Sequence, residues 1–455
     1  MVSATVRNVL VIMTDQHLYT AAGFMGDPWV QTPNLDTLAA GGTVFERAYT
    51  PSPVCVPARQ SLLTGRLPHA HGATGNARPM KPNERTIAHL AQEAGFATGA
   101  TGKMHFIGPD QHQGFETRWD ILDYYRLEPE ASGDAASGMA APGCYGRYVP
   151  GEEGSTADGP NPMTTHNGNY DGQPSPFPAE RHVEAYTSGE AVRFMETHRD
   201  ERWLLWCSYF KPHAPYLPPA QDWERYAAQP LPVPAVDEAQ LATLPAHLQH
   251  FRASTGVDRM DAAAMRRCIA GYYGNVTFID REIGTVLSAL EALGLRDETL
   301  IIFTSDHGEM LGAHGLLAKS NFYEEAWHIP LVVSHPGHRH APRRSGALAC
   351  LTDLYSTIAE SLGLPVKEGV HGHSLLPVVA GQENSGRSHV FSELHTPAGT
   401  LSGVFDGEWK LAVYTDREQL FHLPRDPEEQ HDFSLERPEE VARLRALLEH
   451  DAALE

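Results

Sequence analysis

Cysteine is scarce in this chain of 455 residues, and its pattern argues against two kinds of structural site. The five cysteines are odd in number and scattered, and they include no Cys-x-x-Cys pair, so neither a disulfide framework nor a zinc knuckle is expected. Such usage is typical of a reducing compartment, and we predict a cytoplasmic protein. The cysteines are Cys55, Cys144, Cys207, Cys268 and Cys350.

Long apolar runs are also lacking. The first run, Val9–Met13, is too short for the hydrophobic segment of a signal peptide, and Asp15 follows it closely. No segment approaches the roughly 20 apolar residues that a transmembrane helix requires. Hydrophobic residues nevertheless make up 41% of the chain, which predicts a globular protein with one large domain and an appendage, or with two domains.

Positive charge is in short supply. The chain has 35 lysines and arginines against 57 aspartates and glutamates, which gives a formal net charge of -22. This balance argues against nucleic acids and anionic membranes as partners. An anionic substrate would need cations or a metal gathered locally, and the 25 histidines add candidates for such a site.

Apolar runs that suit buried strands alternate with amphipathic segments that suit helices. This alternation predicts an α/β fold built on a large, mostly parallel sheet. The predicted strands cover residues 8–13, 96–101, 203–209, 299–304 and 329–334. The predicted helices cover residues 32–41, 55–64, 85–94, 181–198, 261–295 and 351–362. In the longest helix, a break near Gly271 and Gly274 is an alternative.

Two stretches lack a clear period. Residues 124–178 are rich in glycine, proline, serine and asparagine, and long loops of this kind are often functional lids. Residues 218–246 are predicted to be irregular. Farther on, short alternating runs predict a small antiparallel sheet, which a helix over residues 438–454 closes. We therefore predict an α/β domain over residues 1–380 and a C-terminal α+β subdomain over residues 381–455.

Several predicted strands are followed by polar, reactive side chains. In open α/β sheets, ligands bind outside the carboxyl ends of the strands, so these residues are expected together at one sheet edge. They are Asp15, Lys103, His105, His213, Asp306 and His307.

The pairs Asp15-Gln16 and Asp306-His307 offer two carboxylates, an amide oxygen and an imidazole. Such a set suits Ca²⁺ or Mg²⁺, and the imidazole leaves Mn²⁺ open. Either aspartate taken alone is more often the cap of the turn that follows its strand.

The stretch from Cys55 to Arg66 places a cysteine at the start of a predicted helix. Pro57 suits the first helical turn, and Gly65 suits the helix end. The helix dipole and the Arg59 guanidinium would favour a tetrahedral oxyanion beside Cys55 and would lower the pKa of its thiol. A lone cysteine before a helix is more often a small buried hydrophobic residue.

The string Cys-x-Pro-x-Arg with the later Thr-Gly-Arg resembles the signature of the type I sulfatases, in the alkaline phosphatase superfamily. Ala58 stands where serine is commoner in that family. Later motifs agree in order, with Gly-Lys-x-His at Lys103 and Pro-His-x-Pro at His213. The resemblance extends from Asp15 to an Asp-Pro-x-Glu element ending at Glu429, without residues 124–180. It implies an alkaline-phosphatase-like sandwich with a small C-terminal α+β subdomain.

The resemblance also implies a modified residue and a metal. In the family, a formylglycine-generating enzyme oxidises the cysteine, which gives formylglycine at position 55 here. One divalent cation is implied, Ca²⁺ foremost with Mn²⁺ and Mg²⁺ as alternatives. Its implied ligands are Asp15, Gln16, Cys55, Asp306 and His307. Gln16 departs from the commoner Asp-Asp pair, so its place in this set is weaker than that of Asp15.

Catalytic roles follow from the same resemblance. Arg59, Lys103 and Lys319 stabilise charge on the sulfate, His213 protonates the leaving alcohol, and His105 is the candidate base. The implied catalytic residues are Cys55, Arg59, Lys103, His105, His213 and Lys319. The implied substrate-binding residues are Asn76, Lys103, His213 and Lys319.

The predicted reaction is hydrolysis of an aryl, choline or carbohydrate sulfate monoester to the alcohol and inorganic sulfate. One hydroxyl of the hydrated aldehyde attacks sulfur, and loss of the proton from the second re-forms the aldehyde as sulfate leaves. A thiol or a serine has no second hydroxyl, which is the chemical reason for the modification. The predicted partners are a small sulfate ester and the formylglycine-generating enzyme, with no nucleic acid and no membrane.

Two other functions stay open. A phosphonate monoester hydrolase or phosphodiesterase of the same superfamily shares the nucleophile and the Asp-Gln and Asp-His pairs, although Lys103 favours sulfate. A non-catalytic anion-binding protein would keep Cys55 as a thiol.

The leaving alcohol and the oligomeric state also stay open. Residues 106–116 resemble the choline-sulfatase branch, whose members tend to form dimers or tetramers. Trp119, Tyr124 and Tyr125 would cage a quaternary ammonium, although aromatic clusters are more often packing.

Overall fold

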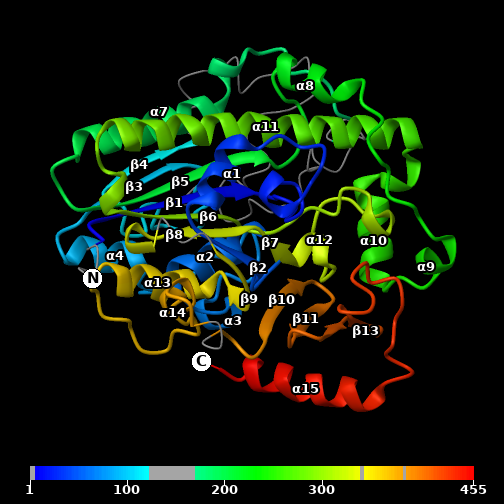
Figure 1. Ribbon diagram of the computed structural model, residues 1–455. Coiled ribbons are helices and arrows are strands. Elements are labelled where there is room, and N and C mark those ends of the chain that lie inside the picture. Colours follow the sequence, from blue (N-terminus) through cyan, green and yellow to red (C-terminus); the bar gives the residue numbers. More distant parts are fainter. Residues whose placement is uncertain (1–5, 122–169, 339–342, 383–385, 455) are drawn as a thin grey trace.

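The computed structural model describes residues 6–121, 170–338, 343–382 and 386–454. Within these ranges the largest element is a sheet of nine strands in the order β4-β3-β5-β1-β6-β8-β2-β7, with β9 beside β2 (Figure 1). The strands are β1 (Asn8–Asp15), β2 (Thr43–Tyr49), β3 (Ala97–Gly102), β4 (Thr117–Asp120), β5 (Trp203–Pro212), β6 (Thr299–Ser305), β7 (His328–Ile329), β8 (Leu331–Ser334) and β9 (Arg343–Cys350).

The sheet is mostly parallel, as predicted. The first five strands in the order run in one direction, because β1 pairs in parallel with β5 and β6, and β3 does so with β4 and β5. β8 runs antiparallel to both β6 and β2, and β9 runs parallel to β2. The single strand predicted over residues 329–334 is wrong in detail, since the segment forms two strands, β7, which pairs with β2, and β8, which pairs with β2 and β6.

The α-helices are α1 (Pro33–Ala40), α2 (Cys55–Thr64), α3 (Pro68–His71), α4 (Ile87–Glu93), α7 (Val183–Thr197), α8 (Ala220–Ala227), α9 (Glu238–Ala242), α10 (Ala246–Thr255), α11 (Ala262–Ala292), α12 (Glu324–Trp327), α13 (Thr352–Ser361), α14 (Leu376–Val379) and α15 (Pro438–Ala452). They cover both faces of the large sheet. Figure 1 shows α7 and α11 on one side of it and α2 and α13 on the other.

The central strand β1 joins these two layers. Its residues are buried along the whole strand, as expected for a parallel strand between two helical layers. Because side chains alternate along a strand, Val9 and Val11 pack with α2, α4 and α13, whereas Leu10 and Ile12 pack with α1, α7 and α11. Two apolar cores therefore fix the position of β1 from opposite sides.

One expectation about helices was wrong, and the single long helix predicted over residues 261–295 is confirmed. The segment predicted to be irregular over residues 218–246 contains α8 and α9. The alternative of a break near Gly271 does not occur, because α11 runs unbroken from Ala262 to Ala292. A Cβ atom added at Gly271 would lie 2.7 Å from the carbonyl oxygen of Tyr216, so this glycine permits a close approach of two backbones.

The C-terminal residues form a separate antiparallel sheet, as predicted. It consists of β10 (Val390–Thr396), β11 (Gly399–Phe405), β12 (Trp409–Val413) and β13 (Glu418–His422), in that order. Its outer face packs on α15 through Leu444 and Leu448. Its other face contacts Trp327 and neighbouring apolar side chains of the large domain. The domain boundary between residues 380 and 381 stays a prediction.

Some predictions concern residues that the structure does not describe. Tyr124, Tyr125 and most of the 124–178 segment lie outside the described residues. In the parts of the chain that are described, no helix combines the length and the apolar character that crossing a bilayer requires.

Candidate active site

Cys55 is the first residue of helix α2 and lies at the carboxyl edge of the large sheet. The extended backbone of Val54 leads into the helix, which begins at Cys55, and every residue of α2 is buried. The helix ends at Gly65, whose φ of 69° is the left-handed conformation that glycine tolerates. The side-chain oxygen of Asn76 accepts the backbone N–H of Val56 at 3.0 Å, so Asn76 satisfies one of the free donors of the first turn.

The register of the sheet brings the other predicted residues to the same edge. Asp15 at the end of β1 lies opposite Pro212, so His213 follows directly beside it. Thr14 pairs with Ser305, the last residue of β6, and Asp306 follows directly after that strand. Gly102 pairs with Ser208, so Lys103 emerges at the same level.

Four buried residues place potential metal ligands within reach of one another. They are Asp15, Cys55, Asp306 and His307, whose ligand atoms all lie within 4.8 Å of each other. The Cys55 Sγ is 3.2 Å from Nε2 of His307 and 3.9 Å from Oδ1 of Asp15. Carboxylate oxygens with one imidazole are donors that suit a hard or borderline divalent cation, so these four of the five predicted ligands fit a metal, and the role of Gln16 as a ligand stays a prediction.

Arg59 forms ion pairs with the two carboxylates of this cluster. Its Nε donates to Oδ2 of Asp306 at 2.9 Å, and its Nη2 donates to Oδ2 of Asp15 at 3.1 Å. Its Nη1 donates to the backbone oxygen of Lys103 and to Oγ of Ser208, both at 2.7 Å. The guanidinium therefore positions the two carboxylates, and the contact between Arg59 and substrate that the sequence predicts stays a prediction.

The ammonium groups of two lysines lie close to the Cys55 sulfur. The Nζ of Lys103 pairs with Asp15 and lies 3.8 Å from the Cys55 Sγ, and the Nζ of Lys319 lies 3.4 Å from the same sulfur. Burial and the Asp15 carboxylate raise the pKa of the Cys55 thiol, but Lys103, Lys319 and His307 outweigh them. The pKa of Cys55 is therefore well below its usual value, which marks a position that stabilises negative charge.

The remaining members of the site are two buried histidines and a glutamine. The backbone N–H of His213 donates to the backbone oxygen of Asp15 at 3.0 Å, and Nδ1 of the His213 ring lies 2.7 Å from the backbone oxygen of Ala214. Burial lowers the pKa of His105 to about 4, although a hydrogen bond with Cys55 opposes this shift. Lys319 donates to Oε1 of Gln16 at 2.6 Å, which ties Gln16 to the cluster.

Three residues at the site were missed by the sequence analysis. The hydroxyl oxygen of Ser208 accepts a hydrogen bond from the Arg59 guanidinium, and the Glu309 carboxylate accepts one from the side-chain amide of Gln16. The hydroxyl of Tyr272 donates to the backbone oxygen of Gln16 at 2.8 Å. Glu309 lies three residues after Asp306, so its motif gave a local signal. Ser208 and Tyr272 gave none, because only the folded register brings them near.

Trp119 is the member of the proposed aromatic cage that lies within the described residues, and the cage itself stays a prediction. Trp119 lies on β4 and packs edge-on against Phe194, at 6.5 Å between ring centroids, as part of the apolar core. Packing therefore accounts for Trp119.

A second group of potential ligands contains His314, Glu325 and Glu429. Glu429 already forms an ion pair with the buried Lys410, which also pairs with Glu324 at 2.9 Å. The lysine supplies the positive charge that a metal would otherwise bring.

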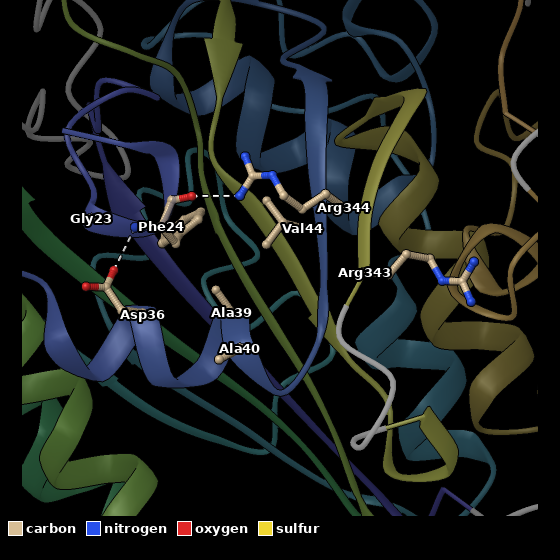
Figure 2. A pocket seen from close by; sticks show the side chains of 8 residues that line it. All are labelled: Gly23, Phe24, Asp36, Ala39, Ala40, Val44, Arg343 and Arg344. Atoms are coloured by element: carbon tan, nitrogen blue, oxygen red, sulfur yellow. Dashed lines mark hydrogen bonds between the residues drawn. The ribbon is translucent and has the colours of Figure 1, made fainter.

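A surface pocket of about 440 Å³ lies near α1, β2 and β9 (Figure 2). Its polar groups are already paired, because Arg344 donates to the backbone oxygen of Phe24 at 2.8 Å and Asp36 accepts the Phe24 N–H at 2.7 Å. In Figure 2 the side chain of Arg343 points away from these residues. The pocket shares no lining residue with the cluster around Cys55.

With this geometry in place, the chain was compared with known proteins. Residues 7–364 match the family described as Sulfatase, which is more than half of the chain. The chain belongs to the sulfatase family. Residues 312–451 also match the family described as N-sulphoglucosamine sulphohydrolase, C-terminal. By family, the chain is a sulfuric ester hydrolase.

Relatives of this sulfatase-family chain agree with the assignment. A choline-sulfatase of Rhizobium meliloti (strain 1021) is 30% identical over 432 residues, which are 92% of this chain and 81% of the relative. An arylsulfatase of Clostridium perfringens (strain 13 / Type A) is 27% identical over 451 residues, which are 97% of this chain and 93% of the relative.

A solved structure confirms the fold. The crystal structure of a phosphonate monoester hydrolase of Agrobacterium radiobacter matches with a TM-score of 0.79 at 23% identity, over 97% of this chain and 96% of the other. The alkaline-phosphatase-like fold that the sequence implied is therefore correct.

Proposed function

We propose that this chain hydrolyses a small sulfate monoester, with an aryl, choline or carbohydrate alcohol as the leaving group. One observation carries the proposal. The Cys55 sulfur lies at the N-terminus of α2, beside the Lys103 and Lys319 ammonium groups and among three further potential metal ligands. This arrangement joins a position for a nucleophile with the positive charge that a sulfate group requires.

Asp15, Gln16, residue 55, Asp306 and His307 are the proposed ligands of one divalent cation. Ca²⁺ is the first choice because oxygen donors predominate, and Mn²⁺ and Mg²⁺ are the alternatives. When bound, such a cation acts as a Lewis acid toward the sulfate oxygens and lowers the pKa of a hydroxyl group next to it. Arg59 serves this set by holding Asp15 and Asp306 in place through two of its nitrogens.

The proposed nucleophile is residue 55 after a formylglycine-generating enzyme has converted Cys55 to formylglycine. As a hydrate, residue 55 offers one hydroxyl for attack on sulfur and a second whose proton is lost as sulfate departs and the aldehyde returns. His105 is the proposed base for that second proton, since it is buried and hydrogen-bonded to position 55.

Lys103 and Lys319 are proposed to bind the sulfate oxygens, together with His213 and Asn76 as further pocket residues. His213 is the proposed general acid for the leaving alcohol. Burial and the nearby Lys319 hold the pKa of His213 well below its usual value in the chain alone. An anionic ester bound between His213 and the lysines would raise that pKa, because it supplies negative charge beside the imidazole.

A cytoplasmic location, a homo-oligomeric state and the role of residues 124–178 stay predictions. A phosphonate monoester hydrolase or phosphodiesterase is the second candidate, and the pairs Asp15-Gln16 and Asp306-His307, which meet at the site, are compatible with it. The second cation beside Cys55, Lys103, favours the sulfate ester.

The transferred group can be tested with two substrates that share a leaving group. We expect a higher kcat/KM on 4-nitrophenyl sulfate than on 4-nitrophenyl phenylphosphonate. Equal leaving groups make the ratio report on the transferred group alone. A kcat/KM that favours the phosphonate would overturn the proposal and support the second candidate.

Substitution of the nucleophile gives a second test. Cys55→Ser should lower multi-turnover sulfate release more than about 10³-fold, the scale seen when a nucleophile is removed. A serine can accept the sulfuryl group once but has no second hydroxyl to expel it. Cys268→Ser, at another buried cysteine, should keep the parent rate. Steady turnover by the Cys55 variant at the parent rate would contradict the mechanism.

The proposed acid makes a prediction about leaving groups. His213→Ala should slow hydrolysis of alkyl sulfates by about 10²–10⁴-fold, because a poor leaving group needs its proton. It should slow 4-nitrophenyl sulfate much less, since nitrophenolate leaves without one. His198→Ala, at a surface histidine, should leave the rates on both esters unchanged. An equal loss by the His213 variant on both substrate classes would rule out the assigned role.

A further inference from the structure

Glu309 is a buried carboxylate beside the active site that none of the roles above uses. It is 0% exposed and follows Asp306 by three residues. Its Oε1 accepts the backbone N–H groups of Leu311 at 2.9 Å and Ala318 at 2.6 Å, and its Oε2 accepts the side-chain amide of Gln16. Three N–H donors therefore stabilise a buried carboxylate, which would otherwise be costly to keep away from water.

The backbone of Gln16 is fixed independently of Glu309. Its N–H donates to Oδ1 of Asp306 at 3.1 Å, and its carbonyl oxygen accepts the hydroxyl of Tyr272 at 2.8 Å. The residue also has a left-handed φ of 64°, directly after the end of β1. What remains to be set is the orientation of the side-chain amide.

Two neighbours determine that orientation by their chemistry. The Lys319 ammonium can only donate, and it donates to Oε1 of Gln16 at 2.6 Å. The Glu309 carboxylate can only accept, and it accepts from Nε2. An amide turned by 180° would set its NH₂ group against the ammonium and its oxygen against the carboxylate, so the observed orientation is the satisfied one.

We propose that Glu309 is a positioning residue that turns the Gln16 amide oxygen toward the metal site. The inference rests on the proposed metal set, because only the oxygen of an amide is a ligand for Ca²⁺. The same carboxylate holds Ala318, the neighbour of Lys319, so one buried group sets both a metal ligand and a sulfate-binding cation.

The test measures metal binding directly, by calorimetric titration of the full metal-free chain with Ca²⁺ and, separately, Mn²⁺. Glu309→Gln keeps an oxygen for Leu311 and Ala318 but sets an NH₂ group against the NH₂ group of Gln16. The Gln16 amide is then expected to turn, and the Kd for the metal should rise about 10- to 100-fold, the usual effect of losing a group that orients a ligand.

A second variant separates orientation from general support of the fold. The double substitution Gln16→Glu with Glu309→Gln exchanges donor and acceptor, so that an oxygen of residue 16 faces the metal again. Its Kd should recover most of the loss. The single variant Gln16→Glu, with two carboxylates in contact, should bind poorly unless residue 309 is also changed. Glu190→Gln, at a buried glutamate of α7 that pairs with Arg193 and belongs to neither group of potential ligands, is the matched control and should bind metal as the parent does.

Each outcome decides the question. A raised Kd in Glu309→Gln that the double substitution corrects supports the positioning role. A parent-like Kd in Glu309→Gln, or a loss that the double substitution leaves uncorrected, overturns that role and leaves the proposed metal site intact. A parent chain that binds neither Ca²⁺ nor Mn²⁺ overturns both the positioning role and the metal site on which it rests.

Discussion

The pairing of Arg59 with Asp15 and Asp306 is the interaction on which the rest of the site depends. Both carboxylates and the guanidinium are fully buried, where unpaired charges would be very costly. A single planar side chain on α2 satisfies both acids and also reaches Ser208 on β5. The same pairing therefore fixes the helix that carries Cys55 against the strands that carry the proposed metal ligands.

The parallel part of the sheet makes this convergence possible. β3, β5, β1 and β6 end at one edge, so Lys103, His213, Asp15 and Asp306 meet although they are far apart in sequence. The site residues at that edge are buried. Because water is largely excluded there, the effective dielectric constant is low and charge interactions are stronger than at the surface. This explains how the lysines can hold the pKa of Cys55 low in a chain of strongly negative net charge.

The sequence alone was sufficient to predict the features that depend on local residue patterns, namely the strands and the residues that follow them. Apolar runs followed by Asp15, Lys103, His213 and Asp306 identified both the parallel strands and the sheet edge at which these residues meet. Contacts that depend on tertiary register could not be predicted. The pocket role expected for Asn76 stays a prediction, and its contact with the first turn of α2 is one that no periodicity signals. The strands β2 and β9, which no local pattern indicated, pair with each other across about 300 residues of sequence.

The most direct test of the account is the mass of the tryptic peptide Ala48–Arg59, from protein made in cells that also contain the formylglycine-generating enzyme. The account predicts the mass of an aldehyde at position 55. An unmodified cysteine in that peptide, despite the maturing enzyme, would remove the proposed nucleophile and contradict the account.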